Sequence, residues 1–287
     1  MKKLLIAAAL VGLSAASALA ADLPVQAYTK APPVVQTTPW TGWYAGINAG
    51  YGWNDRDPAF APNDLAALTL FPPNLGSTLG PSQLRSQGAV GGFQGGYNLQ
   101  FAPSWVAGIE ADFNFSDVKG SSAAASLFAP AAAAPGTNGI FSSSAQLKWF
   151  GTLRGRLGFL ANDNLLLFGT GGLAYGQVDQ SAAYTQTNAA GSIGATNGPI
   201  GFRCAIGVPC FAGAQSQTQV GWTAGAGAEW MFWKNQSVKA EYAYINLGSS
   251  AYTIIAGNPN PATIPSSIRV ANQLDYHIVR AGLNWHF

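Results

Sequence analysis

The last nine residues of the chain, ValArgAlaGlyLeuAsnTrpHisPhe (279–287), alternate strictly between apolar side chains and polar or small ones. Leu283, Trp285 and Phe287 share the apolar parity, and the alternation continues to the final residue. A period of two is typical of a β-strand whose two faces meet different surroundings. Exposed terminal aromatics would promote aggregation of a soluble sheet, whereas in a membrane barrel they lie at the lipid–water interface and closure removes the free edge. The stretch therefore favours a strand of a transmembrane β-barrel.

The beginning of the chain indicates export. Lys2 and Lys3 precede an apolar run over residues 4–13, and Ala18-Leu19-Ala20 is a small-residue cleavage site. This pattern predicts a cleaved signal peptide over residues 1–20. Without Lys2 and Lys3, the 14 basic residues become 12, equal to the 12 acidic ones. A formally neutral mature chain argues against nucleic acid as a partner.

Composition supports a strand-built membrane protein. Charged residues make up only 9% of the chain, where about 25% is usual, as expected if half of each strand faces lipid. No segment after the predicted signal peptide offers the ~18 uninterrupted apolar residues that a helical span requires. Residues 21–41 contain four prolines, which predict an extended periplasmic arm. Residues 42–287 are expected to form an outer-membrane barrel.

The predicted fold is all-β, an eight-stranded antiparallel up-and-down transmembrane barrel with short periplasmic turns and long outer loops. Strands are expected over residues 42–54, 84–101, 105–118, 144–160, 165–178, 217–233, 237–252 and 272–287. Short turns are expected at 102–104, 161–164 and 234–236, because Pro, Asn and Asp favour turn geometry. Long loops are expected at 55–83, 119–143, 179–216 and 253–271.

Aromatic residues recur with a ten-residue spacing, in the pairs Trp43 and Trp53, Trp149 and Phe159, and Trp222 and Phe232. Ten tilted strand residues span on the order of 26 Å, close to the ~25 Å apolar band of a membrane barrel. A lower aromatic girdle is expected from Trp43, Phe101, Trp105, Phe159, Phe232, Trp285 and Phe287, and an upper one from Trp53, Trp149 and Trp222. A soluble sandwich with the same aromatics in its core is the alternative, but it does not require this spacing.

The opposite parity of the predicted strands carries charged side chains. These are Glu110, Asp112, Lys148, Arg154, Arg156, Glu229, Lys239, Glu241 and Arg280. They are expected in the lumen, either as solvated charges of a pore or as a mutually paired plug. Eight strands leave an interior only wide enough for side chains, which favours the plug.

Three motifs suggest a family. TrpThrGlyTrpTyrAlaGlyIleAsnAlaGlyTyrGlyTrp (40–53), GlyGlyPheGlnGlyGlyTyrAsn (91–98) and the final nine residues resemble the small outer-membrane immunogenic proteins, or porin-family β-barrels. The resemblance implies an eight-stranded barrel like the transmembrane domain of OmpA-type proteins, surface-exposed loops and, in some members, haem binding or a structural role in the envelope. It implies location in the outer membrane of a Gram-negative bacterium.

The same resemblance suggests the partners. Phe287, Trp285 and Leu283 resemble the assembly signal of bacterial outer-membrane proteins, so the barrel-assembly machinery is an expected partner of the last strand. Outer-membrane lipid and lipopolysaccharide are expected to surround the barrel. The ligands of the four outer loops are not defined by any motif in the sequence.

The expected function is an envelope structural and surface-antigen role, with a lumen closed by charged side chains. Three alternatives remain: a small diffusion porin, a lipid A-modifying enzyme, and a haem or adhesin receptor. An enzyme needs a nucleophile, a base and an orienting acid within reach of one another. Only His277, beside Asp275, is placed near the outer interface, and His286 is expected at the periplasmic end of the lumen. We expect neither catalysis, nor a metal site, nor a cofactor.

Cys204 and Cys210 are the two cysteines of the chain. They flank the segment AlaIleGlyValPro in an exported protein, where thiols are oxidised. We expect a local disulfide in the third long loop, on which the barrel does not depend.

Overall fold

The computed structural model describes residues 40–64, 67, 84–128, 137–187, 193–194, 201–202, 207–257 and 266–287. The predicted signal peptide and nearly all of the predicted periplasmic arm lie outside these residues. Among the described residues, no helix is long and apolar enough to cross a membrane.

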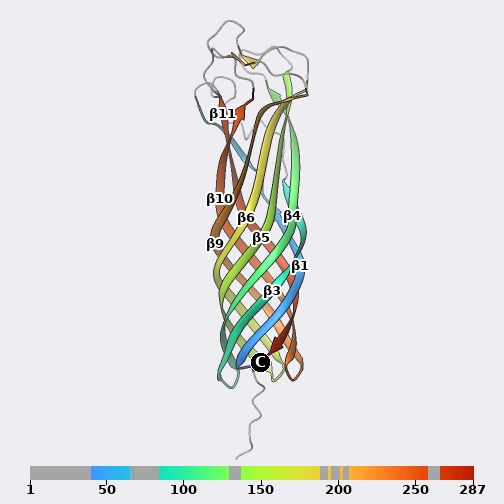
Figure 1. Ribbon diagram of the computed structural model, residues 1–287, viewed down its shortest axis with the longest axis vertical. Coiled ribbons are helices and arrows are strands. Elements are labelled where there is room, and N and C mark those ends of the chain that lie inside the picture. The colour runs from blue at the N-terminus through green and yellow to red at the C-terminus, as the bar shows by residue number, and fades with distance from the viewer. Residues whose placement is uncertain are drawn as a thin grey trace, which may run out of the picture. The chain divides into compact units, whose positions relative to one another are not determined.

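The described chain is built of β-strands, and its eight long strands form one antiparallel ring (Figure 1). The eight long strands are β1 (Gly42–Asp55), β3 (Arg85–Ala102), β4 (Trp105–Phe128), β5 (Thr137–Asn162), β6 (Leu165–Gln186), β9 (Pro209–Trp233), β10 (Gln236–Ala256) and β11 (Ser267–His286). Each pairs with the next, and β1 pairs with β11 to close the ring. A ninth, short strand, β2 (Ala59–Pro62), adds to β11, while β7 (Ile193–Gly194) and β8 (Gly201–Phe202) pair separately.

The three predicted short turns are confirmed. Each connects two consecutive long strands: β3 to β4, β5 to β6, and β9 to β10. Turn chemistry explains the second of them, because the Asn162 side chain accepts a hydrogen bond from the backbone N–H of Asn164 at 3.0 Å. An Asn that bonds the backbone two residues ahead mimics a turn. The C-terminus lies at this end of the ring, where Phe287 N donates to Trp43 O at 2.9 Å (Figure 1).

The predicted loops were too long. Residues 119–128 and 137–143 are paired strand in β4 and β5, and residues 179–186 and 209–216 are paired strand in β6 and β9. These strands contain 22–26 residues, about twice the 9–11 that cross a membrane. The additional segments are rich in Ser, Ala and Gln, and none of the aromatic side chains that the structure describes in them is outward, so their sequence does not show the alternation of a lipid-facing strand.

Candidate functional site

The inward face of the lower half of the ring carries a layer of ionised side chains. Of the nine charged residues expected in the lumen, eight are buried there, each at most 5% exposed: Glu110, Asp112, Arg154, Arg156, Glu229, Lys239, Glu241 and Arg280. Register brings several into direct opposition, since Glu110 lies across from Arg154, and Glu241 across from Arg280. Opposite charges on facing positions stabilise a strand pair.

Six of these residues form a central ion cluster, consisting of Glu110, Asp112, Glu241, Arg154, Lys239 and Arg280. Arg154 donates to Glu110 and Glu241, and its Nη2 lies 3.2 Å from Asp112 Oδ2. Lys239 Nζ lies 2.9 Å from both carboxylate oxygens of Glu110. Arg280 Nη2 lies 2.9 Å from Asp112 and 3.0 Å from Glu241. Three acids and three bases on four strands, β4, β5, β10 and β11, therefore compensate one another.

A second group lies below the central ion cluster. Arg156 forms an ion pair with Glu229 and stacks on Phe168, with its guanidinium carbon 3.9 Å from the ring centre. Glu229 also accepts hydrogen bonds from Ser237 at 2.5 Å and Asn284 at 2.7 Å. The predicted inward position of His286 is observed, and its Nε2 lies 3.4 Å from Glu229. Glu229 is thus satisfied by several donors, as a buried carboxylate requires.

Apolar side chains fill the interior above and below the charged residues. The inward positions of β5 illustrate this: above Arg154 and Thr152 lie Phe150, Leu147 and Phe141, each at most 1% exposed, with the small residues Ala145 and Ser143 between the last two. Phe150 and Leu147 belong to a cluster with Val178, Ile245 and Tyr276. Phe141 belongs to a higher cluster with Tyr184, Phe211, Ile254 and Val270. Trp40, Val106, Leu160, Leu166 and Met231 cluster at the turn end. The sequence prediction, which considered only the charged parity of the lower half, missed these layers.

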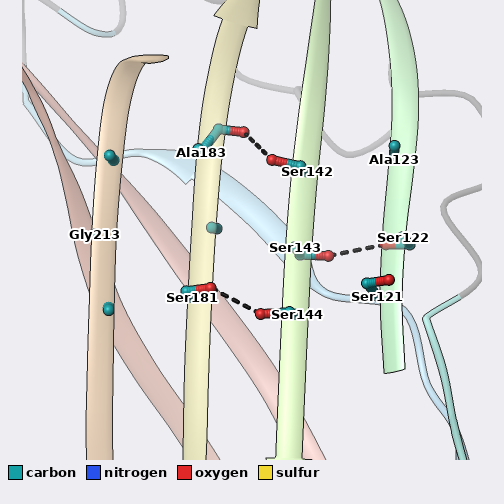
Figure 2. Close-up of a pocket in the computed structure, with 12 residues that line it drawn as sticks. Ser121, Ser122, Ala123, Ser142, Ser143, Ser144, Ser181, Ala183 and Gly213 are labelled. Carbon is teal, nitrogen blue, oxygen red and sulfur yellow. Dashed lines mark hydrogen bonds between the residues drawn. The ribbon is translucent and has the colours of Figure 1, made fainter. Parts of the chain in front are cut away.

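The outward face of the ring is apolar and aromatic near the short turns and changes towards the loops. The outward orientation predicted for the lower girdle is observed, because Trp43, Phe101, Trp105, Phe159, Phe232, Trp285 and Phe287 are all exposed. Above the upper girdle the wall across β4, β5, β6 and β9 is instead made mainly of small residues, Ser, Ala and Gly. Figure 2 shows this wall across β4, β5, β6 and β9, where Ser144 and Ser181 join their hydroxyls at 2.8 Å. A shallow hollow of about 860 Å³ lies here, lined only by Ser, Ala and Gly.

The barrel therefore reverses its polarity along its length. The lower half is apolar outside and charged inside, as in a membrane-embedded barrel. The upper half has mainly small or polar residues outside and mainly apolar residues inside, as in a barrel that stands in water. The reversal occurs near Trp53, Trp149 and Trp222, which places lipid against the lower half and leaves the upper half outside the hydrocarbon core.

Lys148 does not join the charged interior. Its side chain is 43% exposed on the outer wall, with Nζ 3.6 Å from Asp179 Oδ2. The cause is a β-bulge: Leu147 pairs with Val178 and Trp149 with Gln177, which leaves Lys148 without a register partner on β6. A bulge inserts one residue and shifts the parity of everything beyond it. Counting by twos from the turn end therefore fails at this position.

His277 and Asp275 do not form a catalytic pair. The Asp275 carboxylate faces Arg56, whose Nε and Nη2 lie 3.0 and 2.9 Å from its oxygens. His277 is oriented instead by Tyr242, whose hydroxyl lies 2.7 Å from Nδ1, and it stacks on Trp53. The sequence prediction did not include Arg56 or Tyr242, because neither follows a motif. An acid that orients a general base, as a hydrolase needs, is not present at this His among the described side chains.

The remaining expectations from the sequence concern the disulfide between Cys204 and Cys210 and a metal site. Cys204 lies outside the described residues, and Cys210 is buried in the higher apolar cluster, so the disulfide remains a prediction. Within the part of the chain that the structure describes, no group of three or more His, Cys, Asp or Glu residues could hold a metal ion.

Comparison with known proteins places this architecture in a family. A model of the outer membrane protein beta-barrel domain matches residues 6–287. The chain is 34% identical over 296 residues to the 31 kDa outer-membrane immunogenic protein of Brucella melitensis, covering 99% of this chain and 100% of the relative. It is 24% identical over 290 residues to the 25 kDa outer-membrane immunogenic protein of Brucella abortus, covering 100% and 99%. The crystal structure of OprG from Pseudomonas aeruginosa aligns with 13% identity and a TM-score of 0.43, covering 86% of this chain and 97% of that one. The chain thus belongs to the outer-membrane β-barrel domain family and is a protein of the outer membrane of a Gram-negative bacterium.

Proposed function

We propose that this protein is a closed, non-conducting barrel that serves as an envelope structural protein and displays its upper half and loops at the cell surface as an antigen. The observation that carries the proposal is the filled interior. The central ion cluster is buried and compensated, and two apolar clusters lie above it. A hydrated pore needs a continuous polar path, and filled apolar layers oppose one.

The names of the relatives support the surface part of the proposal. Both Brucella proteins are described as outer-membrane immunogenic proteins, which fits a barrel whose upper half protrudes from the membrane. The diffusion-porin alternative is disfavoured by the filled lumen. The lipid A-modifying alternative is disfavoured because Asp275 pairs with Arg56 rather than with His277. No observation on the described residues favours a haem or adhesin receptor.

Planar-bilayer recording tests the closed lumen. The refolded wild-type protein should insert without steady conductance, because ions would have to cross the ion cluster and two apolar layers. The Lys148→Ala variant, changed on the outer wall, should give the same silent trace, and a general porin in the same bilayer provides the positive control. A steady, large conductance from the wild type would refute the closed barrel and favour the diffusion porin.

Surface labelling of intact cells tests the orientation and the exposed upper half. Arg269 is exposed on β11 near the loop end, and Lys234 is exposed in the short turn between β9 and β10. A membrane-impermeant maleimide should label Arg269→Cys on intact cells but should label Lys234→Cys only after lysis, because the short turns are expected in the periplasm. Labelling of Lys234→Cys alone on intact cells would invert the orientation and contradict surface display of the upper half.

A further inference from the structure

The outer wall carries a second polar group at the level where the barrel reverses its polarity. Trp53, Tyr242, Tyr244, Asp275 and His277 lie on β1, β10 and β11, and Arg56 follows β1 directly. We call these six residues the rim cluster. His277 lies opposite Trp53 in the β1–β11 register, and Trp53 belongs to the predicted upper girdle. The cluster is therefore at the height of the lipid headgroups.

Asp275 fixes the Arg56 guanidinium at this height. The carboxylate is only 6% exposed, whereas the Arg56 side chain is 51% exposed. The hydrogen bonds to Asp275 use Nε and Nη2, so Nη1 is not part of this contact. These bonds also raise the pKa of the Arg56 guanidinium above its ordinary value. Tyr244 donates to the same carboxylate at 3.3 Å, which helps to hold the arginine in one orientation.

His277 provides a second donor on the same face. Residues 275 and 277 lie about 7 Å apart along the strand, because the rise is ~3.4 Å per residue. The imidazole stacks on Trp53 at 5.6 Å between ring centres, with an interplanar angle of 17°. When the Tyr242 hydroxyl donates to Nδ1, Nε2 carries the proton and becomes a hydrogen-bond donor.

We propose that the rim cluster binds a phosphate group of an outer-leaflet lipid. A fixed guanidinium and an imidazole N–H are suitable donors for a phosphate oxygen. Trp53 and Tyr242 supply the amphipathic aromatic surface that is typical of the headgroup region. A carboxylate buried under Arg56 on a membrane wall would be unfavourable without its cation, so the pair holds the arginine in place where lipid phosphates lie.

A nearby pair shows what distinguishes this site. Arg85 and Asp55 lie at a similar height on β3 and β1, with Nε and Oδ1 3.4 Å apart, but their side chains are 65% and 62% exposed. Such a pair is an ordinary surface contact of small energetic effect. Arg85 therefore offers a matched control that removes the same charge from the same region.

The chain contains two histidines, which allows a direct test by NMR. In ¹⁵N-histidine-labelled protein in detergent micelles, added lipid A that carries its phosphates should shift the His277 signals and leave those of His286, buried in the lumen, unchanged. Arg56→Gln should weaken binding by about tenfold, because a charge-assisted hydrogen bond is lost. Arg56→Lys should retain part of the affinity, and Arg85→Gln should change it less than about twofold.

Two further probes identify the ligand chemistry. Dephosphorylated lipid A and inorganic phosphate, each at the same concentration, should leave His277 unshifted. An equal shift with dephosphorylated lipid A would refute recognition of the phosphate, and an equal shift with inorganic phosphate would refute the assignment to a lipid.

An equal loss of lipid A affinity in Arg56→Gln and Arg85→Gln would show that general positive charge, and not the rim cluster, attracts the lipid. Retained heat-modifiable migration on a detergent gel verifies that each variant is folded. These outcomes do not depend on whether the lumen conducts ions, so they test the rim cluster separately from the proposed closed barrel.

Discussion

Replacing Arg154 with alanine is expected to lower the free energy of unfolding by about 3–5 kcal/mol. Arg154 is fully buried and contacts three carboxylates, those of Glu110, Asp112 and Glu241. Without it, the central ion cluster retains three acids but only two bases. An uncompensated buried charge is far more destabilising than the absence of the whole ion pair would be. Urea unfolding of the refolded barrel in lipid vesicles, followed by tryptophan fluorescence, measures the change.

Lys148 on the same strand is the matched control. Its side chain is half-exposed and 3.6 Å from Asp179, so Lys148→Ala should change the free energy of unfolding by about 0.5 kcal/mol or less. The double variant Arg154→Ala with Glu241→Ala should be less destabilised than the sum of the two single variants, because the second change removes a charge that the first leaves unpaired. Equal effects of Arg154→Ala and Lys148→Ala would contradict the ion cluster.

The lower half of the barrel could be predicted because two independent periodicities agree there. Aromatics ten residues apart, such as Trp43 and Trp53, follow from the thickness of the apolar band. Charges of the opposite parity, such as Glu110 and Arg154, follow from the pleat of the strand. Both signals depend only on positions within one strand. Those positions can be counted from a short turn, which Pro, Asn and Asp identify in the sequence. The same counting placed His286 in the lumen.

The remaining features depend on information that one strand does not contain. The bulge at Lys148 shifts the parity of β5, so its inward residues change from even to odd numbers above that point, as Phe150 and Leu147 show. Counting by twos from the turn end therefore places Lys148 in the lumen, although its side chain lies on the outer wall. The Arg56–Asp275 pair joins residues 219 positions apart, and only the closure of β1 on β11 brings them together. Register between distant strands could not be obtained from the local pattern.

The sequence predicts loops at 119–143 and 179–216, where the structure has the upper parts of β4, β5, β6 and β9 with small outward residues. Positions such as Ser142 and Ser144 are outward in β5, and Ala183 is outward in β6 (Figure 2). A lipid-facing strand would place large apolar residues there, so the local sequence gives no signal of a membrane strand. The inward residues Phe141, Tyr184 and Phe211 alternate with these small residues and could have indicated a sheet with an apolar interior.

Replacing Phe141 with alanine is expected to unfold the upper half selectively. Phe141 is 1% exposed, and its ring centre lies 4.8 Å from that of Tyr184 and 5.1 Å from that of Phe60. Loss of a buried Phe side chain costs about 3–5 kcal/mol through lost burial and the cavity left behind. Because lipid does not support the upper half, the loss should appear as local opening rather than as loss of the embedded barrel.

Hydrogen exchange separates these two outcomes. In Phe141→Ala, amides of residues 137–147 and 178–186 should exchange roughly a hundredfold faster or more, since each 1.4 kcal/mol corresponds to about a factor of ten. Amides of residues 150–160, beside the ion cluster, should keep their protection. Ser142→Ala, the next residue on the outward face, should leave both segments unchanged, because it removes no buried apolar group. If Phe141→Ala instead accelerated exchange equally along the whole of β5, the two halves would unfold as one unit, and the apolar clusters could not be a core separate from the membrane-embedded barrel.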